Sequence, residues 1–284
     1  MDIKQVLVLG AGTMGHGIAH VAAQAGYEAR LFDVDAAAVE HGLASVKKNL
    51  DKGVEKGKVR EEDRDAALSR LAAADADLAK AASTADLVVE AVPERLELKQ
   101  SIFKTLGESA PSHAILATNT SSLPISEIAN ASGAEDRVLG MHFFNPVHLM
   151  KLLELVKTES TSAEIVDQAK AIGEAMGKTV VVVKDSPGFA TSRLGLVLGL
   201  EAIRMVEEGV ASAQDIDTAL ELGYRHPMGP LKLTDLVGLD VRLGIAEHLA
   251  AVLDDRRFDP PQLLRDMVAE GKLGKKSGQG FYNW

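Results

Sequence analysis

The chain has 284 residues, of which 46% are hydrophobic and 25% are charged, as is typical of a globular protein of one or two domains. It has no cysteine, which excludes disulfides, thiolate catalysis and cysteine-ligated metals. Its formal net charge of -10 argues against nucleic acid as a partner. The N-terminus enters a predicted strand at once, without room for a signal peptide, and no apolar run approaches the ~20 residues of a membrane span. We therefore expect a cytoplasmic protein that does not contact a membrane.

The first predicted element is a buried strand that leads into a glycine-rich turn. The apolar run over residues 5–9 is followed by Gly10, Ala11, Gly12, Thr13, Met14 and Gly15. In a dinucleotide-binding turn, the first glycine permits the tight turn and the second lets the backbone approach the pyrophosphate. The third lets the helix pack closely on the strand. These six residues are therefore expected to hold a dinucleotide, and the alternative is a glycine-rich turn without a ligand.

An acidic residue, Asp33, closes the second predicted strand, residues 28–32. A carboxylate at this place accepts hydrogen bonds from the ribose hydroxyls of NAD and repels the 2′-phosphate of NADP. The alternative is that Asp33 caps the helix that follows. The predicted cofactor is NAD.

The first 185 residues alternate short β-rich runs with helical patterns. This order indicates the α/β class, with a Rossmann-like, doubly wound and mostly parallel sheet. The predicted strands cover residues 5–9, 28–32, 86–92, 114–118, 138–144, 152–157 and 179–184. The predicted helices cover 13–25, 95–107 and 162–176, and a helical arm covers about 35–73, in two parts over 35–57 and 61–73.

The β signal ends after residue 185, and we expect a second, all-helical domain over 186–284. Its predicted helices cover residues 190–208, 215–222, 230–236, 241–253 and 261–270. The first of them is apolar on nearly every face and must be buried. A domain of ~100 residues can hardly surround it alone, which predicts a homodimer through this domain. The first domain, 1–185, is expected to bind NAD and the second to bind substrate, with the ligand in the cleft between them.

One stretch of the acidic chain is basic. It carries Lys47, Lys48, Lys52, Lys56, Lys58 and Arg60, opposed by Asp51 and Glu55. One interpretation is a docking patch for a phosphate-bearing substrate. The other is a solvated helix face with ion pairs between residues four apart.

Two predicted strands carry ionisable residues near the edge where a parallel sheet binds ligands. His142 lies near the carboxyl end of the strand 138–144, and histidine is the usual base for taking a proton from an alcohol. Glu154 is a charged residue inside the apolar strand 152–157, where a carboxylate is rarely buried unless it is paired. A contact between them would select the imidazole tautomer and favour the imidazolium. The alternative is a structural histidine.

A polar run, residues 117–122, ends another strand at the same predicted edge. Its short hydroxyl and amide side chains could hold a substrate oxygen or the nicotinamide, or they could cap the helix that follows. His16 and His20 are four residues apart on the first helix and form at most half a metal site. No metal is predicted.

Four motifs together resemble the 3-hydroxyacyl-CoA dehydrogenases, and most closely the short bacterial 3-hydroxybutyryl-CoA dehydrogenases. They are the segments 117–122, 140–146, 184–189 and 226–230, and the resemblance extends in order to the terminal segment 278–282. It implies reversible oxidation of an (S)-3-hydroxyacyl-CoA by NAD, with His142 as the base and Glu154 as its acidic partner. It also implies that Ser121 contacts the substrate oxygen and the cofactor. The further cofactor contacts that it implies are Asn119, Asn145, Glu94, Lys99 and Lys276, and it assigns the CoA nucleotide to the basic arm with Lys47, Lys48, Lys52 and Lys56.

The chain departs from the family pattern at Ser192, where the family often has asparagine. Serine still donates a hydrogen bond but reaches less far, so Ser192 is the weaker catalytic candidate. Two other functions stay open at this point. One is an NAD-dependent dehydrogenase of a free 3-hydroxy acid or sugar acid, which has no use for a basic arm. The other is a non-catalytic NADH-binding protein, in which His142, Glu154 and Ser121 need not all be present.

Overall fold

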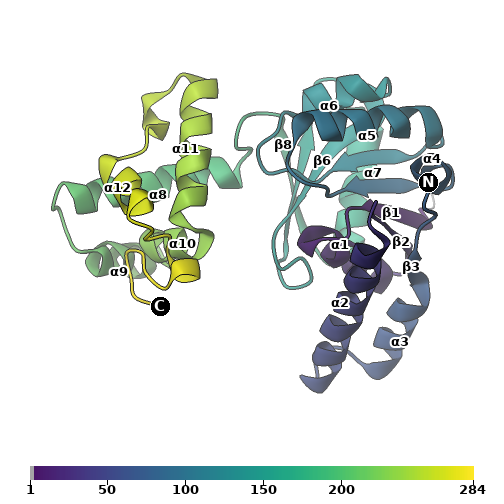
Figure 1. The fold of residues 1–284 in the computed structure, drawn as a ribbon, viewed down its shortest axis with the longest axis horizontal. Helices are drawn as coiled ribbons and strands as arrows, with labels where there is room; N and C mark the ends of the chain where they lie inside the picture. The colour runs from purple at the N-terminus through teal and green to yellow at the C-terminus, as the bar shows by residue number, and fades with distance from the viewer. Residues whose placement is uncertain (1–2) are drawn as a thin grey trace. The chain divides into compact units, whose positions relative to one another are not determined.

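The computed structural model describes residues 3–284, and the chain divides into two compact units. The first unit reaches to Asp185 and the second begins at Ser186 (Figure 1). The first contains the sheet, and the second is helical.

Within the described residues, the sheet of the first unit has eight strands in the order β3-β2-β1-β4-β5-β6-β7-β8. Neighbouring strands pair in parallel, except that β7 runs antiparallel to β6. This arrangement confirms the predicted Rossmann-like, mostly parallel α/β fold. The strands are β1 (Gln5–Leu9), β2 (Glu28–Phe32), β3 (Leu71–Ala73), β4 (Leu87–Glu90), β5 (Ile115–Thr118), β6 (Val138–Phe143), β7 (Leu152–Lys157) and β8 (Thr179–Lys184).

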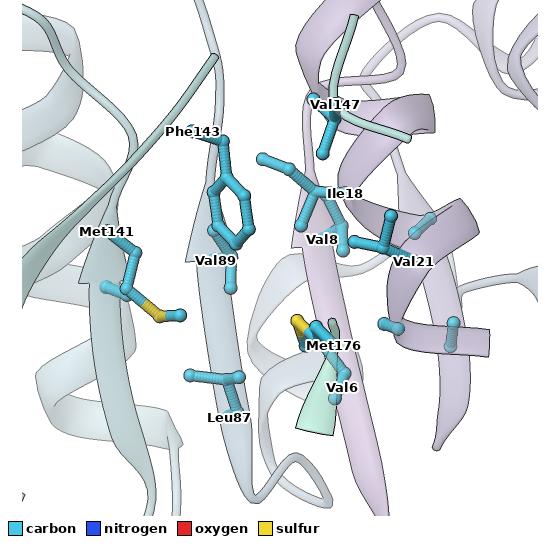
Figure 2. Close-up of a cluster of buried hydrophobic side chains, with 14 of the residues drawn as sticks. Val6, Val8, Ile18, Val21, Leu87, Val89, Met141, Phe143, Val147 and Met176 are labelled. Atoms are coloured by element: carbon cyan, nitrogen blue, oxygen red, sulfur yellow. The ribbon is translucent and has the colours of Figure 1, made fainter. Parts of the chain in front are cut away.

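Helices cover both faces of this sheet. They are α1 (Thr13–Gln24), α2 (Ala36–Glu55), α3 (Glu61–Arg70), α4 (Leu78–Ala82), α5 (Leu96–Ser109), α6 (Ile125–Ser132) and α7 (Ala163–Ala175). Side chains alternate between the two faces of each strand, so Val6 and Val8 of β1 point to the same side. They pack there with Ile18 and Val21 of α1 and with Met176 after α7 (Figure 2). On the opposite side of the sheet, α5 and α6 lie next to each other (Figure 1).

The predicted helical arm is correct for α2 and α3 but wrong for its last three residues. Residues 71–73 form the edge strand β3, which pairs in parallel with Ala29–Leu31 of β2. The reason is that the backbone of β3 pairs with the open edge of β2, a contact that the local sequence does not show. Three residues are also too few to show a strand period. The short helix α4 was not predicted, for the same reason of length.

The second unit consists of α8 (Thr191–Glu207), α9 (Ala213–Gly223), α10 (Pro230–Val237), α11 (Leu239–Leu253) and α12 (Gln262–Ala269), with short 3₁₀ turns between and after them. Its core is built on Leu196, Leu200 and Ile203 of α8. One chain alone does not bury α8 on every face, because Leu194 is 66% exposed and Leu198 is 45% exposed. The partner chain predicted to cover this helix stays a prediction. Along residues 3–284, no helix combines the length and the apolar character that crossing a membrane requires.

Candidate active site

The carboxyl ends of four neighbouring strands bring the predicted site residues of the first unit to one edge of the sheet. Leu9 of β1 pairs with Glu90 of β4, and Glu90 pairs with Thr118 of β5. Thr118 in turn pairs with Gly140 of β6, two residues before His142. Loops that follow parallel strands meet at such an edge, which is where open α/β sheets bind their ligands.

At this edge the glycine turn has the backbone that a dinucleotide needs. Gly10 has φ +92, and a Cβ at this position would lie 2.6 Å from the carbonyl oxygen of Ala91. A Cβ at Gly15 would lie 1.6 Å from the carbonyl oxygen of Gly10, so any side chain there would push α1 away from the turn. A Cβ at Gly12 would meet no protein atom within 4 Å, so the protein itself does not require glycine there. The N-cap residue of α1 is Gly12, which has no side chain that could accept a hydrogen bond. The first N–H groups of the helix are therefore left available for an anion.

Asp33 lies next to this turn and does not cap the following helix. One carboxylate oxygen accepts the N–H of Ala11 at 2.8 Å, and the other accepts the N–H of Asp35 at 3.1 Å. The cap of α2 is Asp35, whose side chain accepts the N–H of Ala37. Asp33 is therefore oriented at the glycine turn, as a ribose-binding carboxylate requires.

His142 and Glu154 face each other across the antiparallel pair β6–β7. They are register partners, and Nδ1 of His142 lies 2.8 Å from Oε2 of Glu154. Glu154 is fully buried and His142 nearly so, and the imidazole also packs on the ring of Phe144 at 4.4 Å between centroids. A carboxylate on Nδ1 orients the ring and places the proton-exchanging position on Nε2.

The loop after β5 carries Asn119 and Ser121. Oδ1 of Asn119 accepts the N–H of Phe143 at 2.9 Å, which ties this loop to the end of β6. Glu94, in the loop after β4, accepts the N–H of Ser121 at 3.0 Å and its hydroxyl at 3.4 Å. The polar run does not cap α6, because the N-cap is Pro124 and Thr120 instead accepts N–H groups of the local turn.

A buried ion pair that sequence reasoning missed lies beneath these loops. Nζ of Lys99 is 2.7 and 3.0 Å from the two carboxylate oxygens of Glu90, and both side chains are fully buried. Burial raises the pKa of Glu90, and the neighbouring Lys99 opposes this shift. The signal that could have found Glu90 is the same as for Glu154, a charged residue inside an apolar strand. The ammonium of Lys99, a predicted cofactor contact, also lies 3.5 Å from a carboxylate oxygen of Glu94.

Asn145 follows β6 in a loop that a buried lysine holds in place. Lys178 donates hydrogen bonds to the carbonyl oxygens of Val147 and Met150, at 2.5 and 2.9 Å. In the same loop, His148 stacks on His20 of α1 with 5.1 Å between ring centroids. Asn145 itself is exposed at this edge of the sheet.

Both units of the chain match families of known proteins. Residues 5–186 match the 3-hydroxyacyl-CoA dehydrogenase NAD binding domain, and residues 188–284 match the C-terminal domain of the same family. The chain belongs to the 3-hydroxyacyl-CoA dehydrogenase family.

Relatives of this dehydrogenase align along its full length. It is 47% identical to a probable 3-hydroxybutyryl-CoA dehydrogenase of Bacillus subtilis, across 100% of this chain and 98% of that protein. It is 44% identical to a 3-hydroxybutyryl-CoA dehydrogenase of Mycobacterium tuberculosis, across 99% of each. The crystal structure of (S)-3-hydroxybutyryl-CoA dehydrogenase from Ralstonia eutropha superposes with a TM-score of 0.94 at 38% identity, over 100% of this chain and 99% of that one.

The dehydrogenase uses NAD as its cofactor. The residues present fit this group, because the turn at Gly12 admits a close ligand and Asp33 is oriented beside it. Among the residues that the structure describes, no group of three or more histidine, aspartate or glutamate side chains is arranged to hold a metal ion.

The four candidate lysines of the dehydrogenase's arm are exposed. Lys47, Lys48 and Lys52 lie on the solvent face of α2, and Lys56 directly follows the last residue of this helix. Lys47 forms an ion pair with Asp51 at 2.6 Å, as the solvated-face interpretation expects. Three other lysines are exposed and repeat at intervals of four residues, and no carboxylate of residues 3–284 pairs with them. They are Lys48, Lys52 and Lys56.

Two predicted site residues belong to the second unit. Ser192 is half-buried in the first turn of α8. Lys276 is exposed in the 3₁₀ turn Lys275–Ser277 and lies 2.6 Å from a carboxylate oxygen of Asp240 on α11. This hydrogen bond lowers the pKa of Asp240.

Proposed function

We propose that this dehydrogenase interconverts (S)-3-hydroxybutyryl-CoA and acetoacetyl-CoA, with NAD as the hydride acceptor. The names of its full-length relatives from Bacillus subtilis and Mycobacterium tuberculosis support the four-carbon substrate. The observation that carries the reaction type is the contact between His142 and Glu154 at the ligand-binding edge of the sheet.

In this proposal, Nε2 of His142 takes the proton from the 3-hydroxyl group of the substrate during oxidation. Glu154, on Nδ1, stabilises the imidazolium that forms, and in the reverse direction the imidazolium returns the proton. When bound, NAD supplies the carbon that accepts the hydride from C3 of the substrate. The Ser121 hydroxyl, which donates to Glu94 in this structure, turns to donate to the same substrate oxygen when substrate binds, and the Ser121 N–H keeps its bond to Glu94. Ser192 is a second, weaker candidate for this contact.

The cofactor contacts are proposed on both units. In the first unit, the turn of Gly10, Ala11, Gly12, Thr13, Met14 and Gly15 binds the pyrophosphate, and Asp33 binds the adenosine ribose. Asn119, Ser121 and Asn145 contact the nicotinamide half, with Glu94 and Lys99 supporting this side. Lys276 of the second unit completes the set.

The acyl-CoA substrate is proposed to bind its nucleotide on the arm. Lys47, Lys48, Lys52 and Lys56 supply positive charge against the phosphates of CoA. The support for this role is that the last three are exposed and have no carboxylate partner among residues 3–284. Lys47 is the weakest member because Asp51 already neutralises it.

The second unit, 186–284, is proposed to contribute to substrate binding and to form a homodimer. The partner proposed to cover the exposed apolar side chains of this unit is a second copy of the chain. α8 exposes Leu194 and Leu198 one turn apart, and α10, which packs against α8, exposes Leu233 and Val237 one turn apart. Exposed apolar side chains on two adjacent helices support an interface with a second copy. We also propose that the enzyme works in the cytoplasm, where NAD and CoA esters are available to it.

The test of this function is a steady-state assay with NADH and a series of ketone substrates. Acetoacetyl-CoA, its longer 3-ketoacyl-CoA homologues and free acetoacetate are compared at equal concentration. The proposal expects the highest kcat/KM with acetoacetyl-CoA. Higher activity on free acetoacetate would assign the chain to free 3-hydroxy acids instead, and NADH binding without turnover of any substrate would make it a binding protein.

A further inference from the structure

The inference concerns Lys99, which lies between two carboxylates. Its Nζ binds both oxygens of Glu90, at 2.7 and 3.0 Å, and lies 3.5 Å from Oε2 of Glu94. Lys99 and Glu90 are fully buried, whereas the Glu94 side chain is 38% exposed. The cation therefore links a buried carboxylate to one at the surface of the site.

Glu90 is fixed from several directions. Besides Lys99, it accepts the hydroxyl of Thr118 at 2.6 Å and the N–H of Val92 at 2.7 Å. These partners lie on β5 and in the loop after β4, so Glu90 joins the two strand ends that carry the site loops. Each group in this buried cluster has a partner, as a stable buried ion pair requires.

Glu94 connects this buried cluster to Ser121, the proposed substrate contact. Its Oε1 accepts the hydroxyl of Thr120 and both the N–H and the hydroxyl of Ser121. A continuous series of contacts therefore runs from Glu90 through Lys99 and Glu94 to Ser121.

We propose that Glu90 is a positioning residue for Ser121, acting through Lys99 and Glu94. This inference rests on the proposed role of Ser121 in the reaction. With Glu90 present, its buried carboxylate neutralises the charge of Lys99. Glu94 then remains available to accept hydrogen bonds from Ser121 in the loop after β5. Without Glu90, the buried ammonium has only Glu94 as a carboxylate partner and draws it away from Ser121, because an unpaired buried charge is costly.

The experiment is a double-mutant cycle that measures kcat for acetoacetyl-CoA reduction at saturating NADH. Glu90→Gln is combined with Ser121→Ala, and each single variant is measured beside the double variant. We expect Glu90→Gln to lower kcat by about 10-fold when Ser121 is present and by less than about 2-fold when it is absent, a coupling usual for connected residues. Glu90→Asp, which keeps the charge, should recover most of the loss.

The control is Arg137→Met, which removes a different buried charge from the first unit. Arg137 donates to the carbonyl oxygens of Pro111 and Ala114, before β5 begins and so at the opposite edge of the sheet from Ser121. In the double variant, the fold-loss in kcat should equal the product of the fold-losses of Arg137→Met and Ser121→Ala, because the two residues are not connected. If Glu90→Gln does not fold, Thr118→Val replaces it in the same cycle, because it removes a hydroxyl donor that fixes Glu90 and leaves both buried charges in place. Its loss of kcat should be smaller than that expected for Glu90→Gln and should again depend on the presence of Ser121.

The outcomes separate this inference from the proposed function. Equal fold-losses from the Glu90 variant with and without Ser121 would overturn the positioning role, as would a failure of Glu90→Asp to recover activity. Ser121→Ala alone is expected to lower kcat on the order of 10²-fold, as the loss of one transition-state donor does. If Ser121→Ala turns over like the wild type, the proposed role of Ser121 fails, and the inference about Glu90 fails with it.

Discussion

Nδ1 of His142 lies 2.8 Å from Oε2 of Glu154 because β7 runs antiparallel to β6 and places the two residues directly opposite each other. β6–β7 is the antiparallel pairing among the otherwise parallel pairings of the described strands. It places the buried carboxylate of Glu154 beside His142, near the carboxyl end of β6 where the ligand is expected to bind. The Glu154 carboxylate is fully buried, so water does not screen its charge from the imidazole of His142.

The first prediction concerns His142→Gln. This variant should lower kcat roughly 10²- to 10⁴-fold, because the proton then has no positioned acceptor, while NADH binding by fluorescence titration stays close to wild type. The matched control is His113→Gln. His113 also contacts a carboxylate, Asp86, at 3.1 Å, but both residues precede their strands and lie at the opposite edge of the sheet. A comparable loss in both variants would contradict the assignment of His142.

The second prediction concerns cofactor choice. Asp33→Ala should lower kcat/KM for NADH and raise it for NADPH, since the variant loses the ribose contact and the repulsion of the 2′-phosphate. Asp35→Ala is the control, because Asp35 caps α2 and accepts the N–H of Ala37. It should reduce the free energy of unfolding by about 1 kcal/mol without changing the NADH/NADPH ratio. An unchanged ratio in Asp33→Ala would refute its role.

The third prediction concerns the arm. Lys48→Glu and Lys52→Glu should each raise KM for acetoacetyl-CoA, and the effect should shrink at high salt because the phosphates and the arm interact through solvent. KM for acetoacetyl-N-acetylcysteamine, which lacks the nucleotide, should not change. Lys170→Glu, an exposed charge reversal on α7, serves as the control. Equal KM changes for the two thioesters would argue against nucleotide binding on α2.

The fourth prediction follows from His20, which is buried against His148. Burial is the largest cause that lowers the pKa of His20 to about 4, and the neighbouring His148 lowers it further. Between pH 6.5 and 4, the unfolded chain therefore binds a proton that the folded protein does not, so the stability contributed by neutral His20 is lost as the pH falls. The contribution is on the order of 2–4 kcal/mol.

Urea unfolding of the wild type and of His20→Gln at pH 7 and pH 4.5 measures this contribution. The gap in unfolding free energy between the two pH values should be smaller in His20→Gln. In the control His248→Gln, an exposed position on α11, the gap should equal that of the wild type. Identical gaps in all three proteins would refute the prediction.

The fifth prediction concerns assembly. Leu198→Glu places a charge on the exposed apolar face of α8 and should convert the proposed dimer into a monomer in light scattering after size-exclusion chromatography. Val182→Glu, at an exposed position of the edge strand β8, should leave the mass unchanged. A wild-type protein that is monomeric at micromolar concentration would rule out the dimer.

Much of the fold could be predicted because its signals are local. The alternation of short apolar runs with helical periods indicates the doubly wound sheet, and the glycine turn is contiguous in the chain. The elements that escaped prediction, β3 and α4, are the shortest, and β3 exists only because β2 offers it an open edge. His142 and Glu154 could each be singled out because an ionisable residue in an apolar strand is rare.

The amino-acid sequence alone determined the cofactor turn, the residue types of the site and the change from a sheet to helices at residue 185. Only the tertiary structure decided which of these residues meet. Asp33 contacts the turn while Asp35 caps the helix, Lys99 binds Glu90, and Glu94 holds Ser121. Apart from the local Asp35 cap, these contacts join residues of different strands, helices and loops. Their distances depend on strand order and register, which are set by the packing of the whole sheet.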